Sequence, residues 1–269
     1  MTGRISVLRS LVAVLLLAFL GAILLPWQIR LQHQGKTAGF RSISLNLGLR
    51  EQIGQSGFLA ALSGFRSPLA AILWIEAHSA WEKTEWGRMA SLFDTVITLQ
   101  PHNLLYWDIA AWHMAWNASA AALQDRMQPS QALRERAARQ YIALGRDILE
   151  RGIRNNPDDY LLYERLGILL RDKQQDHSAA ADAFSKAASF SSAPAYLKRF
   201  AVYEVSKVPG REREAYDRLR SLYDEGKKER FPTLLGRLQE LEKKLSIPME
   251  QRISFPVSRS SSPVPHPPK

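Results

Sequence analysis

The sequence contains no cysteine, which excludes disulfide bonds, thiolate metal sites and cysteine nucleophiles. It also lacks a Walker A loop, a GxGxxG turn, a GxSxG elbow and an HExxH pair, which mark common nucleotide-binding and hydrolytic sites. Six histidines are present, but none forms a tight cluster with Asp and Glu at metal-ligand spacing. The sequence therefore predicts no catalytic residue, no cofactor and no metal site, and favours a binding protein over an enzyme.

Acidic residues are missing from the first 50 positions, where six basic side chains lie. The segment from residue 247 onward carries three basic residues and one acid, and the chain between these two ends is close to neutral. The net charge of +10 is therefore concentrated beside an apolar segment and in a tail. This distribution favours a membrane surface as a partner and predicts no binding of nucleic acid.

Residues 11–29 form an apolar stretch, LVAVLLLAFLGAILLPWQI, with 19 residues and no charge. As a helix this segment would measure about 28 Å, close to the hydrocarbon thickness of a bilayer. Trp27 and Arg30 stand where interfacial aromatic and basic residues belong. We therefore predict a transmembrane helix that contacts the lipid bilayer through residues 11–29.

The alternative for this segment is a cleaved signal peptide, with residues 1–10 as its basic start. No A-x-A cleavage site follows at the usual distance, and the apolar run is long for a signal peptide, which favours an uncleaved signal anchor. A short basic N-terminal arm usually stays in the cytoplasm. The prediction is a single-pass inner (cytoplasmic) membrane protein whose body lies on the extracytoplasmic side.

Three further regions follow the predicted anchor. Residues 30–63 are rich in glycine and predict a juxtamembrane connector, because closely spaced glycines disfavour a long helix. Residues 64–246 have helical periodicity, interrupted by proline and glycine at helix-length intervals, which predicts an all-α domain. Residues 247–269 are rich in proline and serine and predict a disordered tail.

Two predicted helix ends share the same spacing. Phe93 is followed by Pro101 eight residues later, and Leu149 is followed by Pro157 at the same distance. The two prolines lie 56 residues apart, which exceeds a 34-residue repeat by 22 residues. The excess predicts an insertion near residues 117–135, which contain a further proline.

The domain resembles the tetratricopeptide repeat (TPR) family, whose units pair two antiparallel helices with the pattern aromatic-x2-Leu-Gly-x2-Tyr, then Ala-x3-Phe and a closing proline. The matching segments are Tyr163-x2-Leu166-Gly167-x2-Leu170 with Ala180-x3-Phe184, and Trp107-x2-Ala110-Ala111-x2-Met114 with Gly145-x3-Leu149. The resemblance covers residues 68–226 and implies a right-handed solenoid of helix pairs, closed by a capping helix at 233–245. Other two-helix repeats remain an alternative.

Residues 64–117 are also similar to bacterial membrane-anchored repeat proteins of unassigned function. The shared pattern has the form GFR…LW…A…W…LQP…W…AW…N. This resemblance implies a helical repeat fold and a membrane location, and it implies no activity.

The family resemblance places one face of each first helix on a concave groove. Trp74, His78 and Trp81 follow i, i+4, i+7 spacing and therefore share a helical face. The residues predicted to bind a partner are Trp74, His78, Trp81, Asp108, Trp112, Trp116, Glu164 and Arg171. The competing account is that these side chains pack between helices, or that the connector at 30–63 fills the groove.

Two classes of function are compatible with these features. The favoured one is a membrane-anchored scaffold or adaptor of a cell-envelope complex, which binds a protein or peptide in the groove of its repeats. The alternative is an accessory or catalytic subunit of an enzyme system that acts on an envelope polymer, such as polysaccharide or peptidoglycan.

Overall fold

The computed structural model describes residues 64–253 of the chain. The predicted basic arm, the anchor at 11–29, the connector at 30–63 and the tail from residue 254 lie outside the described residues. Residues 64–253 form helices and turns without a strand, which confirms the all-α class. Within the same range, no helix combines the length and the apolar character needed to cross a bilayer.

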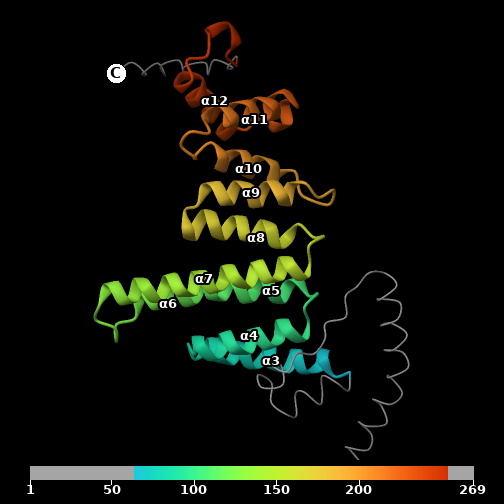
Figure 1. Cartoon of the computed structure of the whole chain (residues 1–269), viewed down its shortest axis with the longest axis vertical. Coiled ribbons are helices and arrows are strands. Elements are labelled where there is room, and N and C mark those ends of the chain that lie inside the picture. Colours follow the sequence, from blue (N-terminus) through green and yellow to red (C-terminus); the bar gives the residue numbers. More distant parts are fainter. Residues whose placement is uncertain (1–63, 254–269) are drawn as a thin grey trace, which may run out of the picture. The chain divides into compact units, whose positions relative to one another are not determined.

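The chain divides into two compact units after Arg165, inside helix α8 (Leu161–Leu169). The first unit ends with the beginning of α8 (Figure 1). Its preceding elements are α3 (Arg66–Glu82), α4 (Trp86–Leu99), α5 (Leu104–Trp112), the π-helical turn η1 (His113–Ala118), α6 (Ser119–Gln124) and α7 (Gln131–Asn155).

The first unit consists of two antiparallel helix pairs and the start of a third. Helix α3 packs along α4, and the continuous rod of α5, η1 and α6 packs along the long helix α7 (Figure 1). The segment 117–135, predicted as an insertion, forms the end of this rod, a short loop and the first turns of α7. It therefore lengthens both helices of the second pair. Ser130 begins α7 by accepting a hydrogen bond from the N–H of Leu133.

Small residues allow the second pair to approach closely. Gly145 of α7 faces Ala111 and Ala115, all three of which are buried. A Cβ atom at Gly145 would lie 2.8 Å from the carbonyl oxygen of Ala111 and 2.8 Å from the Cβ of Ala115. Gly145 and Ala111 are small positions of the repeat pattern predicted from the sequence, and here they lie in close contact.

The turns that join successive pairs have the same local structure. Gln100 ends α4 with φ −130° and ψ 63°, and Asn156 ends α7 with φ −136° and ψ 63°. Three residues further on, the side chains of Asn103 and Asp159 each accept a hydrogen bond from the backbone N–H two residues ahead. The side-chain amide of Asn156 also donates to the carbonyl of Pro101 at 2.8 Å. Turns related by 56 residues are therefore equivalent, and a hydrogen bond connects them.

Ion pairs join equivalent helices of successive pairs. Asp108 of α5 contacts Arg165 of α8 at 3.0 Å, and Asp94 of α4 contacts Arg151 of α7 at 2.7 Å. The first helices of the pairs in this unit consequently form one layer and the second helices form another.

The second unit begins within α8 and contains four further α-helices. Helix α9 packs on α10, and α11 packs on both α10 and α12, around a core of leucine, valine, alanine and tyrosine side chains. Helix α12 occupies the segment predicted to form a capping helix at 233–245. The bounds are η2 (Leu170–Gln174), α9 (His177–Ala188), α10 (Tyr196–Val205), α11 (Glu212–Asp224), η3 (Lys227–Glu229), α12 (Pro232–Lys244) and η4 (Met249–Gln251).

We predict that Gly145→Ala destabilises the first unit by about 1–3 kcal/mol, because the added methyl group overlaps the facing helix. Gly87→Ala is the matched control, since a Cβ there meets nothing within 4 Å. Loss of backbone freedom in the unfolded state should make Gly87→Ala stabilising by about 0.5–1 kcal/mol. Urea unfolding followed by circular dichroism measures both. Equal changes in the free energy of unfolding for the two variants would contradict the close approach of the helices at Gly145.

Candidate functional site

The three predicted residues of α3 differ in exposure. Trp74 is half-buried, and its ring centroid lies 5.1 Å from Phe93 and 4.8 Å from Tyr106. Trp81 is also half-buried, and its ring lies 5.1 Å from His78, which is exposed. Trp74 therefore packs between helices, whereas His78 and Trp81 extend toward solvent.

His113 connects these rings to those of the second helix pair. Its ring centroid lies 5.6 Å from Trp81, 5.6 Å from Phe93 and 5.0 Å from Trp112. Neighbouring rings are therefore in continuous contact from the interior of the first unit to its surface. We call this group the aromatic cluster; its members are Tyr106, Trp74, Phe93, His113, Trp81, His78 and Trp112.

His113 lies where α5 joins a π-helical turn. The α-helix α5 ends at Trp112, and η1 begins at His113. A π turn adds one residue to the helix, which rotates the residues after it by about 100° relative to an uninterrupted α-helix. The amide Nδ2 of Asn117 lies 3.0 Å from His113 Nδ1 and donates to it, which fixes the imidazole ring. Such turns inside α-helices are often found at functional sites.

The His113 ring is neutral at pH 7. Burial, together with the nearby charge of His78, lowers its pKa from 6.5 to about 4. With Asn117 as donor to Nδ1, the ring proton lies on Nε2. His78 itself is 61% exposed at the side chain and lies 3.7 Å from Glu82. The cluster therefore contains two imidazoles, the neutral, half-buried ring of His113 and the solvent-exposed ring of His78.

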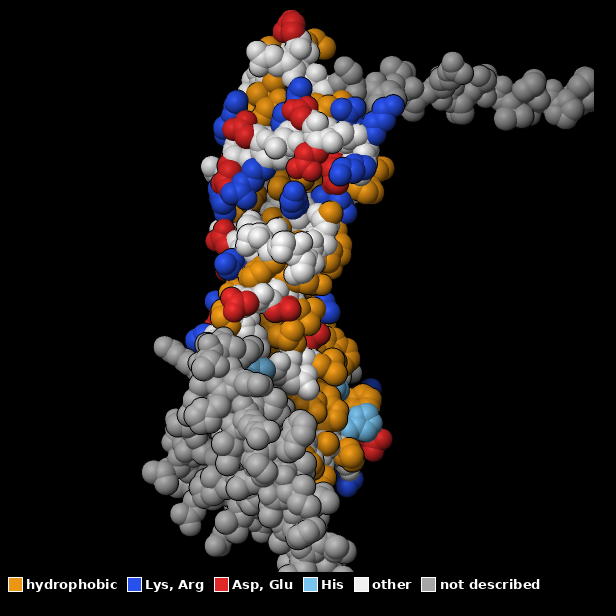
Figure 2. Space-filling view, turned by 90° about the vertical axis from the view of Figure 1, so that its right-hand side faces the viewer, with side chains coloured by type: hydrophobic (Ala, Val, Ile, Leu, Met, Phe, Trp, Pro, Cys, Tyr) orange, Lys and Arg blue, Asp and Glu red, His pale blue; other side chains and the backbone are white. Residues whose placement is uncertain are grey.

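The free end of the aromatic cluster is apolar. Trp112 is 44% exposed, although it is one of the largest side chains in the chain. Figure 2 shows hydrophobic side chains beside histidine on the surface at the level of α3 and α4. Exposed large apolar side chains next to a rigid packed base are typical of interaction surfaces.

Two of the predicted residues hold helices together. Asp108 has a side chain only 18% exposed and forms an ion pair with Arg165 at 3.0 Å between its Oδ2 and the arginine Nε. Glu164 is 5% exposed, and its Oε1 lies 4.0 Å from Arg165 Nη1. Their spacing resembles that of groove residues, but their partners are within the protein.

The remaining two predicted residues differ in position. Trp116 lies on η1 and is half-buried. Arg171 belongs to the second unit, where its guanidinium pairs with Asp172 at 2.6 Å and lies 5.4 Å from the ring of Phe200. The hydrogen bond to Asp172 raises the pKa of Arg171. Arg171 is therefore already engaged by an acid and an aromatic ring.

Sequence reasoning misses the connecting members of the cluster. The residues predicted to bind a partner include neither His113 nor Phe93. His113 follows Tyr106 by seven residues, so ordinary helical spacing already places these two side chains on one face. The one feature of the sequence that indicates the cluster is the high density of aromatic residues between positions 74 and 116.

Within residues 64–253, no three side chains of His, Asp or Glu are arranged so that they could share a metal ion. In comparisons with known proteins, no family model, curated protein or solved structure matches this chain.

We predict that acid weakens the first unit partly through His113. Because the folded-state pKa is about 4 and the reference value is 6.5, unfolded chains bind the proton more readily. The stabilisation is complete above about pH 6.5 and is lost as the pH falls toward 4, amounting to about 1–2 kcal/mol for this half-exposed ring. His113→Phe keeps an aromatic ring and removes the titration.

The measurement compares the free energy of unfolding at pH 7 and pH 4.5. The decrease should be smaller in His113→Phe than in the original protein by about 1–2 kcal/mol. An identical decrease in both proteins would show that His113 does not change its protonation between these pH values.

Two tryptophans of α5 should respond differently to truncation. Trp107 is 2% exposed and donates from Nε1 to the carbonyl of Pro101 at 2.8 Å, so Trp107→Ala should cost about 3–5 kcal/mol. Trp112 keeps one ring contact and much solvent exposure, so Trp112→Ala should cost about 1 kcal/mol. Thermal melting measures both. A loss at Trp112 as large as that at Trp107 would make Trp112 a core residue.

Proposed function

We propose that this chain is a membrane-anchored scaffold or adaptor of a cell-envelope complex, which binds a protein partner on the layer formed by its first helices. The observation that carries the proposal is the exposed end of the aromatic cluster. A large indole at Trp112 stands in solvent, on a base of rings already packed against one another. A rigid base reduces the entropy lost on binding, because fewer side-chain rotamers must be fixed.

The proposed architecture is a solenoid of TPR-like helix pairs. Three observations support it: small residues at the helix crossing, equivalent turns 56 residues apart, and ion pairs between corresponding helices. In such an array each pair contacts its neighbours, and the first helices line a continuous face. The cluster lies across the first helices of two successive pairs, α3 and α5.

The proposed binding surface is narrower than the eight residues indicated by spacing. His78, Trp81 and Trp112 form its accessible part, and Trp74 supports them from below. Trp116 lies on η1, which also carries His113 of the cluster, whereas Arg171 belongs to the second unit. Asp108 and Glu164 stabilise the proposed surface through Arg165. The partner chemistry that fits is an apolar or aromatic protein segment, because Trp81 and Trp112 offer ring faces and His78 offers a hydrogen bond at the edge.

The proposed location is the inner membrane, with residues 11–29 as an uncleaved anchor and the helical domain outside the cytoplasm. The support is the length and apolar character of this segment, together with the basic residues that flank it.

The proposal is tested by site-specific photo-crosslinking in membranes. A photoreactive phenylalanine analogue is introduced at position 112 or at position 231, because Trp112 and Phe231 are both 44% exposed. The chain should remain in the membrane fraction after a high-salt wash, since burial of apolar surface is not screened by salt. Position 112 should give a discrete protein adduct that position 231 does not give.

A second substitution tests whether the adduct at position 112 depends on the aromatic cluster. Trp81→Ala should reduce the adduct formed from position 112, whereas Leu123→Ala, which removes another exposed apolar side chain, should not. Equal adducts from both positions, or no protein adduct from position 112, would contradict a partner site on this face.

A further inference from the structure

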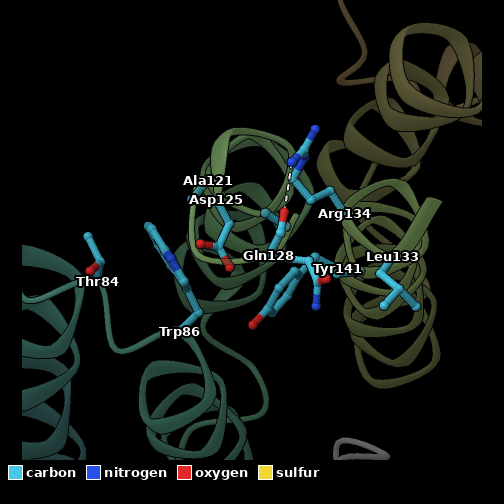
Figure 3. A pocket seen from close by; sticks show the side chains of 10 residues that line it. Thr84, Trp86, Ala121, Asp125, Gln128, Leu133, Arg134 and Tyr141 are labelled. Carbon is cyan, nitrogen blue, oxygen red and sulfur yellow. Dashed lines mark hydrogen bonds between the residues drawn. The ribbon is translucent and has the colours of Figure 1, made fainter. Parts of the chain in front are cut away.

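A crevice of about 480 Å³ lies on the first unit, outside the aromatic cluster. It is formed by the α3–α4 connection, by α6 with the loop that follows it, and by the first half of α7 (Figure 3). Its size is within the range of small-molecule binding sites. One wall comes from the segment 117–135, so the lengthening of the second helix pair creates this crevice.

Two aromatic rings stand at the sides of the crevice. Trp86 is at the start of α4 and Tyr141 is on α7, and both are half-buried. Neither ring contacts another aromatic ring or a cation within the described part of the chain. In Figure 3 they flank a space toward which the carboxylate of Asp125 points. Both rings can therefore offer a face to a ligand.

Hydrogen-bonding side chains line the same crevice, and several of their polar atoms are free. Asp125 uses Oδ1 to accept from the N–H of Met127 at 2.9 Å, which leaves Oδ2 available. Arg134 uses Nη1 to donate to the carbonyl of Gln128 at 2.7 Å, which leaves its other N–H groups available. The Nε1 of Trp86 and the hydroxyl of Tyr141 have no hydrogen-bond partner among residues 64–253. The crevice therefore offers both hydrogen-bond donors and hydrogen-bond acceptors to a ligand.

The charges and polarity of the lining restrict the ligand. The lining carries one cation, Arg134, and one anion, Asp125, so its charges balance and a ligand without net charge suits it. A purely apolar ligand would remove water from several polar groups without replacing their hydrogen bonds, at about 1–3 kcal/mol each. The ligand that satisfies all groups is neutral, has many hydroxyls, and has flat C–H faces for the two rings.

We infer that this crevice binds a neutral sugar unit of a glycan. The pyranose ring stacks on Trp86 and faces Tyr141, Asp125 accepts from its hydroxyls, and Arg134 donates to them. The site is separate from the aromatic cluster and does not depend on the proposed protein partner. A chain with both sites joins a protein to a carbohydrate.

The test uses the full chain, purified in a detergent without a sugar headgroup, because glucosides and maltosides would occupy the site. Isothermal titration calorimetry is performed with cellotetraose, maltotetraose and chitotetraose as probes. At least one should bind saturably at about 10 mM or below. Trp86→Ala and Tyr141→Ala should each weaken binding about tenfold, and Asp125→Asn about threefold or more.

Met127→Ala is the matched control, because Met127 lies on the same loop and is 90% exposed but does not line the crevice. It should leave sugar affinity unchanged. Trp86→Phe, which keeps a ring, should retain more affinity than Trp86→Ala and so separates stacking from misfolding. No binding of any tetrasaccharide would overturn the proposal. So would binding that both aromatic substitutions leave intact, or a preference for N-acetyl-arginine amide or a capped neutral peptide.

Discussion

The pairing of α5 and η1 with α7 depends on the absence of a side chain at Gly145. The helices are so close that a Cβ atom there would lie 2.8 Å from the backbone oxygen of Ala111. A second glycine of α7, Gly152, makes room for an aromatic ring, because a Cβ atom there would lie 3.0 Å from the Trp107 indole. The aromatic cluster joins the first pair, α3 and α4, to α5 and η1.

The cluster changes in character from its interior to its surface. Phe93 is buried, His113 is half-buried and kept neutral, and Trp112 reaches solvent. A charged imidazole among these rings would lose hydration without gaining an acidic partner, and the depressed pKa of His113 expresses that cost. Because neutral His113 packs against both Trp81 and Trp112, the position of these two rings depends on the packing beneath them.

Two surfaces of the first unit differ in what they offer a ligand. The accessible end of the cluster is apolar with one polar edge at His78, which fits a protein segment. The crevice beside α7 combines two rings with free donors and acceptors, which fits a sugar. The extra length at 117–135 explains why both occur in one unit, because the added helical turns provide the second wall of the crevice.

The sequence by itself determined the helices, their breaks at Pro101 and Pro157, and the small residues where they cross, because these follow from local backbone preference and periodicity. It could not decide which polar residues face a groove. Glu164 shares the spacing of groove positions yet is buried near Arg165, and His113 contacts rings of both α3 and α4. The tertiary structure decided these points, since burial and ring contact depend on the neighbouring helix.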